Sequence, residues 1–229
     1  MKLSIVIPFY NEENMIQKMY DALVAEVNKI TKAEFEIIFI NDGSKDRTFE
    51  KMLAIADGDS RVKYISFSRN FGKEAGTIAG LEYATGEAVI LMDGDLQHPP
   101  ALLPQMIEAY EEGYDVVSAR RTRTGEKPHR TFLAKHFYRL ANKMMDIELM
   151  DGVSEFRLFS RKAVRAIHSL QEYNRFSKGI FSWIGFKEKV IEYENQVRTV
   201  GETKYSLKFS LNYAIQGILS FNDKPLRMC

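Results

Sequence analysis

The sequence predicts an α/β fold with a Rossmann-like, mostly parallel central sheet. Four short runs rich in β-branched residues show little polar alternation, which is typical of strands buried on both faces. A helical pattern separates each run from the next, and polar motifs directly follow the runs, where sheets of this kind bind ligands. The four predicted strands span residues 3–8, 35–40, 62–67 and 88–92.

Helices and strands alternate over the first half of the chain and become irregular beyond residue 120. Helical patterns cover residues 12–30, 47–56, 73–84 and 100–110, and a fifth strand covers 115–119. A basic loop follows. Beyond it we predict helices at 130–146, 162–170 and 175–184, and strands at 156–159 and 187–197.

The composition excludes several classes of protein. A net charge of +1 argues against a generally basic nucleic-acid binder. No run reaches the roughly 18 apolar residues of a membrane-spanning helix, so we expect the chain to be soluble or peripheral to a membrane. The single cysteine, Cys229, excludes an internal disulfide, and with no signal-peptide pattern this favours a cytoplasmic location.

Two carboxylates separated by one residue, Asp93 and Asp95, follow the fourth predicted strand. Both can point into the same crevice, and their oxygens suit Mg²⁺ or Mn²⁺ bridging phosphates. Gln97 is close enough along the chain to add a further oxygen ligand. A motif of this kind is also common in solvated turns, so the neighbouring motifs decide between the two interpretations.

The segments after the first and second strands carry side chains suited to a nucleoside. Tyr10 can stack on a base, and the neighbouring Asn11 and Glu12 can form hydrogen bonds with it. Asp42 supplies a carboxylate for a base or a ribose. The same residues also fit a helix start capped by Asn11 and an Asx turn after the second strand.

Signatures of other enzyme folds are absent. No G-x-G-x-x-G motif follows the first strand and no P-loop motif occurs, which argues against nicotinamide dehydrogenases and P-loop enzymes. Ser154 does not lie in a nucleophile elbow. The four histidines have no metal-ligand spacing.

Taken together, the motifs resemble the inverting glycosyltransferases of family 2, which have the GT-A fold. The resemblance rests on residues 5–12, 41–44, 70–73 and 93–100. Features further along the chain are similar to the polyprenyl-phosphate glycosyltransferases, the group of dolichyl-phosphate mannose synthase and bactoprenol glucosyltransferases. These features lie at residues 156–158, 182–186, 198–205 and 220–227, so the resemblance covers nearly the whole chain.

The resemblance implies a catalytic domain at residues 1–200, in which 1–119 bind nucleotide-sugar and metal and 120–200 bind the acceptor. It implies a cation held by Asp93, Asp95 and Gln97. It also implies catalytic roles for Asp95, Glu155 and Arg157, although bacterial relatives commonly have aspartate at position 155. The implied nucleotide-sugar residues are Pro8, Tyr10, Asn11, Glu12, Asp42, Lys73, Asp93 and Gly94.

The segment from residue 120 to 139 is rich in arginine and lysine and is expected to bind the phosphate of a polyprenyl phosphate. Arginine binds phosphate bidentately, so Arg120, Arg123 and Arg130 are the candidates, and a solvated basic face is the alternative. Residues 201–229 form a predicted amphipathic helical segment. The pattern is compatible with a helix at a membrane surface and with a helix packed on the domain core, and both interpretations are left open.

The expected reaction is one in-line displacement, at the cytoplasmic face of a bacterial membrane, with a UDP-linked hexose or N-acetylhexosamine as donor. A phosphate monoester has a second pKa of about 6, so no strong base is required. A transferase acting on a polysaccharide hydroxyl would need one, such as Glu155 or Asp151. A non-catalytic sugar-nucleotide or membrane-binding module and a nucleotidyltransferase are two further functions that the motifs leave open. Relatives often continue into transmembrane helices, and a homo-oligomer is left open.

Overall fold

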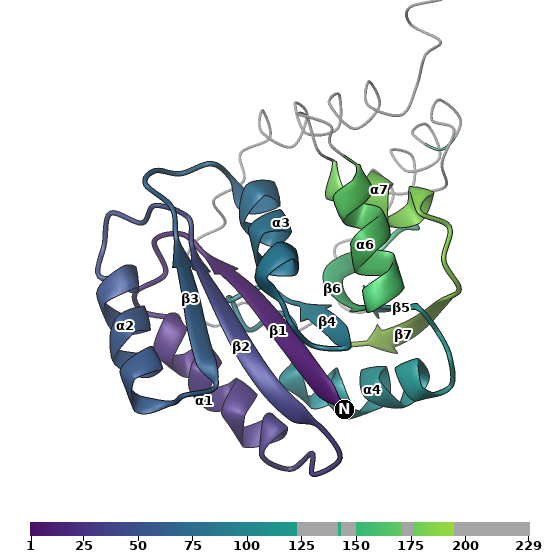
Figure 1. The fold of residues 1–229 in the computed structure, drawn as a ribbon, viewed down its shortest axis with the longest axis horizontal. Coiled ribbons are helices and arrows are strands. Elements are labelled where there is room, and N and C mark those ends of the chain that lie inside the picture. The colour runs from purple at the N-terminus through teal and green to yellow at the C-terminus, as the bar shows by residue number, and fades with distance from the viewer. Residues whose placement is uncertain (123–141, 143–149, 171–175, 195–229) are drawn as a thin grey trace, which may run out of the picture.

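A computed structural model shows a three-layer architecture in which helices cover both faces of one sheet (Figure 1). The structure describes residues 1–122, 142, 150–170 and 176–194. The predicted helix at 130–146 lies outside the described residues except for residue 142, and the predicted segment at 201–229 lies wholly outside them. Within the described residues, no helix is both long and apolar enough to cross a bilayer.

The central sheet has seven strands in the described part of the chain, in the order β3-β2-β1-β4-β6-β5-β7. Its pairs are parallel except for those of β6, which runs antiparallel to both β4 and β5. The predicted α/β fold with a mostly parallel sheet is therefore confirmed. The strands are β1 (Lys2–Phe9), β2 (Glu34–Asn41), β3 (Val62–Ser66), β4 (Ala88–Leu91), β5 (Val116–Arg121), β6 (Val153–Ser160) and β7 (Glu188–Tyr193).

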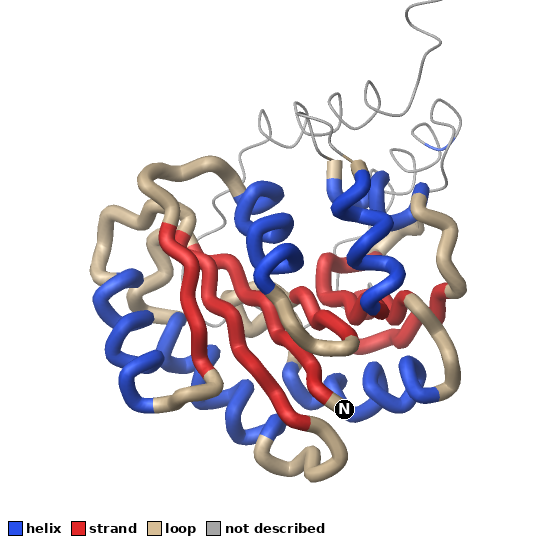
Figure 2. Tube along the Cα trace, viewed as in Figure 1, coloured by secondary structure: helices blue, strands red, loops and turns tan. Residues whose placement is uncertain are grey.

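The helices form two apolar layers, one on each side of the sheet (Figure 2). Alternate residues of β1 contact opposite layers: Ile5 and Ile7 belong to one cluster of buried residues and Val6 to the other. This explains why β1 is apolar without alternation. One layer contains α1 (Ile16–Val27), α2 (Thr48–Gly58), the 3-10 turn η1 (Pro100–Leu102) and α4 (Leu103–Glu111); the other contains α3 (Lys73–Tyr83), α6 (Arg161–Ser169) and α7 (Ser177–Trp183).

Helix α1 begins at Ile16, later than the predicted start at residue 12. Asn11 has a left-handed backbone with φ of 52°. The next two backbone N–H groups, of Glu12 and Glu13, donate to the side chains of Thr48 and Asp46 at 2.8 and 3.1 Å. The loop after β1 is thus bonded to the loop before α2 and to the first residue of that helix, and does not continue as helix.

A buried carboxylate joins the amino-terminal ends of the strands. Glu36 of β2 is 3% exposed. Its Oε1 accepts hydrogen bonds from the Ser4 hydroxyl at 2.5 Å and the Thr85 backbone N–H at 2.6 Å. Its Oε2 accepts one from Lys63 Nζ at 2.8 Å. This network connects β1, β2, β3 and the turn before β4.

The order of the strands reverses between β1 and β4. Strands β2 and β3 extend the sheet on one side of β1, whereas β4 pairs on its other side after the chain passes through α3. In doubly wound sheets, ligands bind beyond the carboxyl ends of the strands at such a reversal. Tyr10 follows β1 there and Asp93 follows β4, so the predicted motifs meet at this edge of the sheet.

Candidate active site

Antiparallel strand β6 brings a distant carboxylate to the end of β4. Leu91, the last residue of β4, pairs with Arg157 of β6. Because the two strands run in opposite directions, the beginning of β6 lies beside the segment that follows β4. Glu155 consequently reaches the site of Asp93 although 61 residues separate them in the sequence.

Lys73, the first residue of α3, bridges these two carboxylates. Its Nζ lies 2.5 Å from Asp93 Oδ1 and 2.7 Å from Glu155 Oε2. Burial opposes the charge of the ammonium, but attraction by Asp93 and then Glu155 raises the pKa of Lys73 well above its usual value. Burial likewise opposes ionisation of Asp93, yet Lys73 lowers the pKa of that carboxyl to about 2. Lys73 and Asp93 are therefore both charged at neutral pH.

His98 holds the loop that carries the two aspartates, and sequence reasoning missed it because the histidines lack metal-ligand spacing. Its Nδ1 accepts a hydrogen bond from the Asp93 backbone N–H at 2.9 Å, and its ring stacks on Phe156 with centroids 5.4 Å apart. Burial lowers the pKa of His98, so its imidazole is neutral at pH 7. Its position beside the aspartates in the motif was the available signal.

The glycine between the two aspartates is required by packing. A Cβ atom at Gly94 would lie 2.3 Å from Cε1 of Phe9, far inside van der Waals contact. Phe9 is buried and packs edge-on against Phe39, with centroids 5.3 Å apart, so its ring has little room to move. The nucleotide-sugar role predicted for Gly94 stays a prediction, and the structure gives the residue this steric role.

The donor atoms at the end of β4 fit a hard divalent cation. Asp93 and Asp95 offer carboxylate oxygens, and the half-buried Gln97 follows with its backbone N–H bonded to Asp95 Oδ1 at 3.1 Å. Among the described residues, no group of three or more His, Cys, Asp or Glu side chains could hold a metal by itself. Two carboxylates leave coordination positions of a cation open, and Mg²⁺ commonly fills such positions with phosphate oxygens and water.

Asp42, at the end of β2, organises the loop before α3. One oxygen accepts the Phe71 backbone N–H at 2.7 Å, and the other accepts the Gly72 N–H at 3.0 Å and the Asn70 side-chain amide at 2.8 Å. Burial raises the pKa of Asp42, and the two backbone bonds oppose this shift. Its predicted nucleoside role remains a prediction, since the structure shows a carboxylate already bound to protein donors.

The loops after β1, β2 and β3 enclose a pocket of about 570 Å³. The Asn11 N–H donates to Ser44 Oγ at 3.1 Å, and Asn11 Oδ1 accepts from the Lys45 N–H at 2.8 Å, which joins two of these loops. Of the residues predicted to bind a nucleotide-sugar, only Tyr10 lines the pocket; Pro8 lies in β1 beside α3. The lining is Tyr10, Asn41, Gly43, Ser44, Lys45, Phe49, Ser66, Phe67, Ser68, Arg69 and Asn70.

Arg157, predicted as catalytic, is buried behind the site. It is 3% exposed, its Nη1 lies 3.4 Å from Glu188 Oε1, and its guanidinium lies 5.3 Å from the centre of the Phe181 ring. Burial lowers the pKa of Arg157, and the charge of Glu188 opposes that effect. These contacts tie β6 to β7 and α7, and the catalytic role stays a prediction.

The structure describes one of the three arginines predicted to bind the acceptor phosphate. Arg120 lies at the end of β5, and its guanidinium pairs with Glu192 of β7 on an exposed surface. Arg123 and Arg130 lie outside the described residues.

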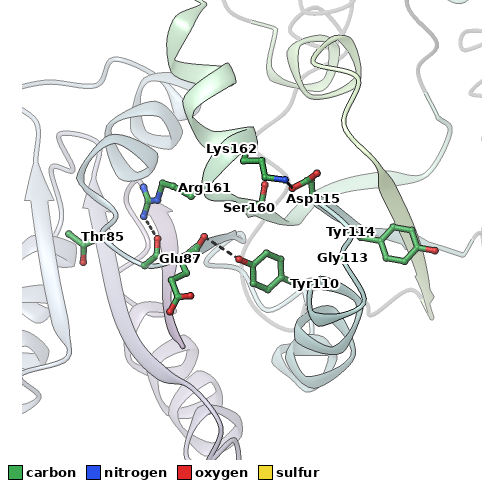
Figure 3. A pocket seen from close by; sticks show the side chains of 10 residues that line it. Thr85, Glu87, Tyr110, Gly113, Tyr114, Asp115, Ser160, Arg161 and Lys162 are labelled. Carbon is green, nitrogen blue, oxygen red and sulfur yellow. Dashed lines mark hydrogen bonds and ion pairs between the residues drawn. The ribbon is translucent and has the colours of Figure 1, made fainter.

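A second pocket, of about 610 Å³, lies at the opposite end of the sheet. Figure 3 shows the side chains that line it. It is formed by the residues before β4 and β5 and the start of α6, and none of the predicted site residues lines it. The Arg161 guanidinium donates to the backbone carbonyls of Ala84 and Gly86, and Lys162 lies 3.5 Å from Asp115. Both of these cationic groups are therefore already bonded to protein oxygens.

Residues 4–167 match the family model described as Glycosyl transferase family 2. The chain belongs to this family. The matched range begins within β1 and extends through β4, after which Asp93 and Asp95 follow. It continues through Glu155 and β6. The family predicted from the motifs is confirmed for this glycosyltransferase.

Curated relatives match this family 2 glycosyltransferase over its whole length. The putative glycosyltransferase CsbB of Bacillus subtilis is 51% identical over 227 residues, which are 99% of this chain and 69% of the relative. A prophage bactoprenol glucosyl transferase homolog of Escherichia coli is 42% identical over 229 residues, which are 100% of this chain and 74% of the relative.

Solved structures show the same fold at low sequence identity. The glucosyl-3-phosphoglycerate synthase of Mycobacterium tuberculosis, in complex with Mn²⁺, UDP and glucosyl-3-phosphoglycerate, has a TM-score of 0.60 at 19% identity and covers 95% of this chain and 77% of its own. The mannosyltransferase PcManGT of Pyrobaculum calidifontis, in complex with GDP-Man and Mn²⁺, has a TM-score of 0.61 at 17% identity, covering 83% of this chain. This chain spans 54% of that mannosyltransferase. The predicted GT-A fold is confirmed.

Proposed function

We propose that the protein transfers a sugar from a nucleotide-sugar to a polyprenyl phosphate and inverts the anomeric configuration. The observation that carries the proposal is the meeting of Asp93, Glu155 and Lys73 at the carboxyl edge of the sheet. Relatives named bactoprenol glucosyl transferase, 42% identical over the whole chain, support the acceptor class. The proposed donor is a UDP-linked hexose or N-acetylhexosamine.

Asp93, Asp95 and Gln97 are the residues that would hold Mg²⁺ or Mn²⁺. Such a cation supplies positive charge that stabilises the departing diphosphate. Support comes from the hard oxygen ligands that follow β4 and from the Mn²⁺ named with two solved structures of the same fold. Two carboxylates leave coordination positions of a cation open for phosphate oxygens, which suits a donor that carries a diphosphate.

In the proposed reaction, an oxygen of the lipid phosphate forms a bond to the anomeric carbon. The bond from that carbon to the diphosphate breaks, and its electron pair leaves with the nucleoside diphosphate. The attacking phosphate is already anionic at neutral pH, with a second pKa of about 6, so no residue has to remove a proton. This agrees with Glu155 being held 2.7 Å from Lys73 in an ion pair. In this scheme Glu155 orients the site, and Arg120, Arg123 and Arg130 bind the lipid phosphate.

The insoluble acceptor leads us to propose that the protein works at the cytoplasmic face of a bacterial membrane. We propose residues 1–119 as the donor half, 120–200 as the acceptor half and 201–229 as the membrane-surface segment. Flotation of the full chain with vesicles containing anionic lipid tests this location, because a membrane-surface segment should carry the protein to the lipid fraction. Failure to float would leave that segment without a membrane role. The oligomeric state is left open.

A donor screen with undecaprenyl phosphate in detergent micelles tests the reaction. The full chain, Mg²⁺ or Mn²⁺ and one donor at a time are assayed for release of nucleoside diphosphate. We expect release with a UDP-sugar that requires both the lipid and the cation. Asp95→Asn should lower the rate at least about 100-fold, whereas Asp57→Asn, at an exposed position of α2, should not change it. A soluble saccharide product would favour transfer to a polysaccharide, and release of pyrophosphate from a nucleoside triphosphate would favour a nucleotidyltransferase.

A further inference from the structure

Both carboxylate oxygens of Asp93 face protein groups. Lys73 Nζ lies 2.5 Å from Oδ1, and His98 Nε2 lies 3.8 Å from Oδ2. Lys73 contacts Glu155 as well, at 2.7 Å, so its ammonium is shared between the ends of β4 and β6. A divalent cation that binds Asp93 through Oδ1 would lie beside this ammonium and compete with it for the same oxygen.

The chain delivers Lys73 to this position through an anchored loop. Asp42 accepts the backbone N–H groups of Phe71 and Gly72, the two residues directly before Lys73. The start of α3 is therefore held in place, while the Lys73 side chain keeps the rotational freedom of its four-carbon stem. The side chain has a relative accessibility of 32%, so part of it borders the crevice, while its ammonium is held between Asp93 and Glu155.

The three carboxylates of the site explain why position 73 is a lysine. Asp93, Asp95 and Glu155 lie at neighbouring strand ends, and without a cation their charges repel one another. A lysine ammonium relieves that repulsion. A divalent cation also relieves it, and the ammonium and the divalent cation repel each other. A donor diphosphate changes this balance, because it offers Lys73 a second anion.

We infer that Lys73 is the resident counter-ion of the metal carboxylates and releases Asp93 to the cation when a donor diphosphate arrives. The inference rests on the proposed function and names a positioning residue for it. In the donor-free protein the Lys73 ammonium is paired with Asp93, and this pairing lowers the affinity of the site for a cation. In the loaded protein Lys73 pairs with the diphosphate and Glu155. Cation binding and donor binding are coupled through this one side chain.

The affinity of the donor-free full chain for Mn²⁺, measured by electron paramagnetic resonance of the free ion, tests the inference. Lys73→Gln and Lys73→Met should bind Mn²⁺ about tenfold more tightly than the wild type, because they remove a competing charge from Asp93. Lys73→Arg keeps the charge and should remain close to the wild type. Lys162→Gln, at an exposed lysine of α6 that pairs with Asp115, changes the net charge equally and should leave the affinity unchanged.

UDP provides a second measurement, in which the wild type shows the coupling and Lys73→Gln assigns it to the lysine. UDP should tighten Mn²⁺ binding to the wild type and uridine should not, and the gain from UDP should shrink about tenfold in Lys73→Gln. Equal or weaker Mn²⁺ binding by both charge-removing variants would overturn the inference, and so would an equal effect of uridine. Asp95→Asn distinguishes the counter-ion role of Lys73 from the metal site itself. If Asp95→Asn abolishes Mn²⁺ binding and Lys73→Gln changes nothing, the metal site stands and the counter-ion role is wrong. No Mn²⁺ binding in the presence of UDP would overturn both.

Discussion

Replacing Gly94 with alanine should displace the loop that carries the two aspartates. The new Cβ would lie 2.3 Å from Phe9 Cε1 and 2.7 Å from Cδ1, whereas ordinary contacts begin near 3.4 Å. The overlap therefore exceeds about 1 Å, and the ring of Phe9 is confined by Phe39. Overpacking of this kind costs about 1–3 kcal/mol. We expect Gly94→Ala to lower the free energy of unfolding by that amount and to weaken Mn²⁺ binding in the presence of UDP.

A double-mutant cycle with Phe9→Leu separates the steric effect from any role of Gly94 toward the sugar. Urea denaturation gives the free energy of unfolding of the single and double variants. Removing the ring should relieve the clash, so the double variant should be at least about 1 kcal/mol more stable than additivity predicts. Gly58→Ala is the matched control, because a Cβ at the end of α2 meets nothing within 4 Å. Strict additivity of Gly94→Ala and Phe9→Leu would refute the steric explanation.

Three further results are expected. Glu36→Gln should lower the free energy of unfolding, measured by urea denaturation, by about 3–5 kcal/mol, because it breaks a buried ionic network. Glu34→Gln, at an exposed position, should lower it by less than about 0.5 kcal/mol. Equal losses would contradict the network. Burial opposes ionisation of Glu36, but hydrogen bonds lower its pKa. Its contribution is thus present above its unfolded pKa of about 4.3 and lost as the pH falls further, and Glu36→Gln should remove this acid dependence of the urea midpoint. His98→Ala leaves the Asp93 amide without its acceptor. The affinity for Mn²⁺ in the presence of UDP, measured by paramagnetic resonance, should fall about tenfold. An unchanged affinity would contradict the positioning role of His98. Arg120→Ala should raise the KM for lipid phosphate, leave the donor KM unchanged and alter stability by less than about 1 kcal/mol; an unchanged acceptor KM would remove Arg120 from the site.

The parallel part of the sheet was predictable because burial on both faces leaves a continuous apolar run. Residues 3–8 were predicted as a strand and Lys2–Phe9 form β1, with alternate side chains in opposite layers. The edge of the sheet that carries the site was predictable from the strand topology. Motifs that follow parallel strands meet at their carboxyl ends, as Asp93 and Tyr10 do.

The antiparallel strand was beyond sequence reasoning, because periodicity does not encode strand direction. Glu155 was therefore predicted as a catalytic residue from resemblance alone, and its ion pair with Lys73 depends on the direction of β6. The bonds of Asp42 were hidden for another reason. Their donors are backbone N–H groups of Phe71 and Gly72, which no residue type reveals. His98 acts through a backbone bond in the same way.

The most direct test of the proposed transfer follows the sugar itself. The full chain is incubated with UDP-sugar labelled in the sugar, undecaprenyl phosphate and Mn²⁺, and the organic phase is then analysed. We expect the label in an acid-labile, lipid-linked sugar phosphate with inverted anomeric configuration, and at least about 100-fold less label with Asp95→Asn. Label that stays in the aqueous phase, or that enters the lipid equally well with Asp95→Asn, would contradict metal-dependent transfer to a polyprenyl phosphate.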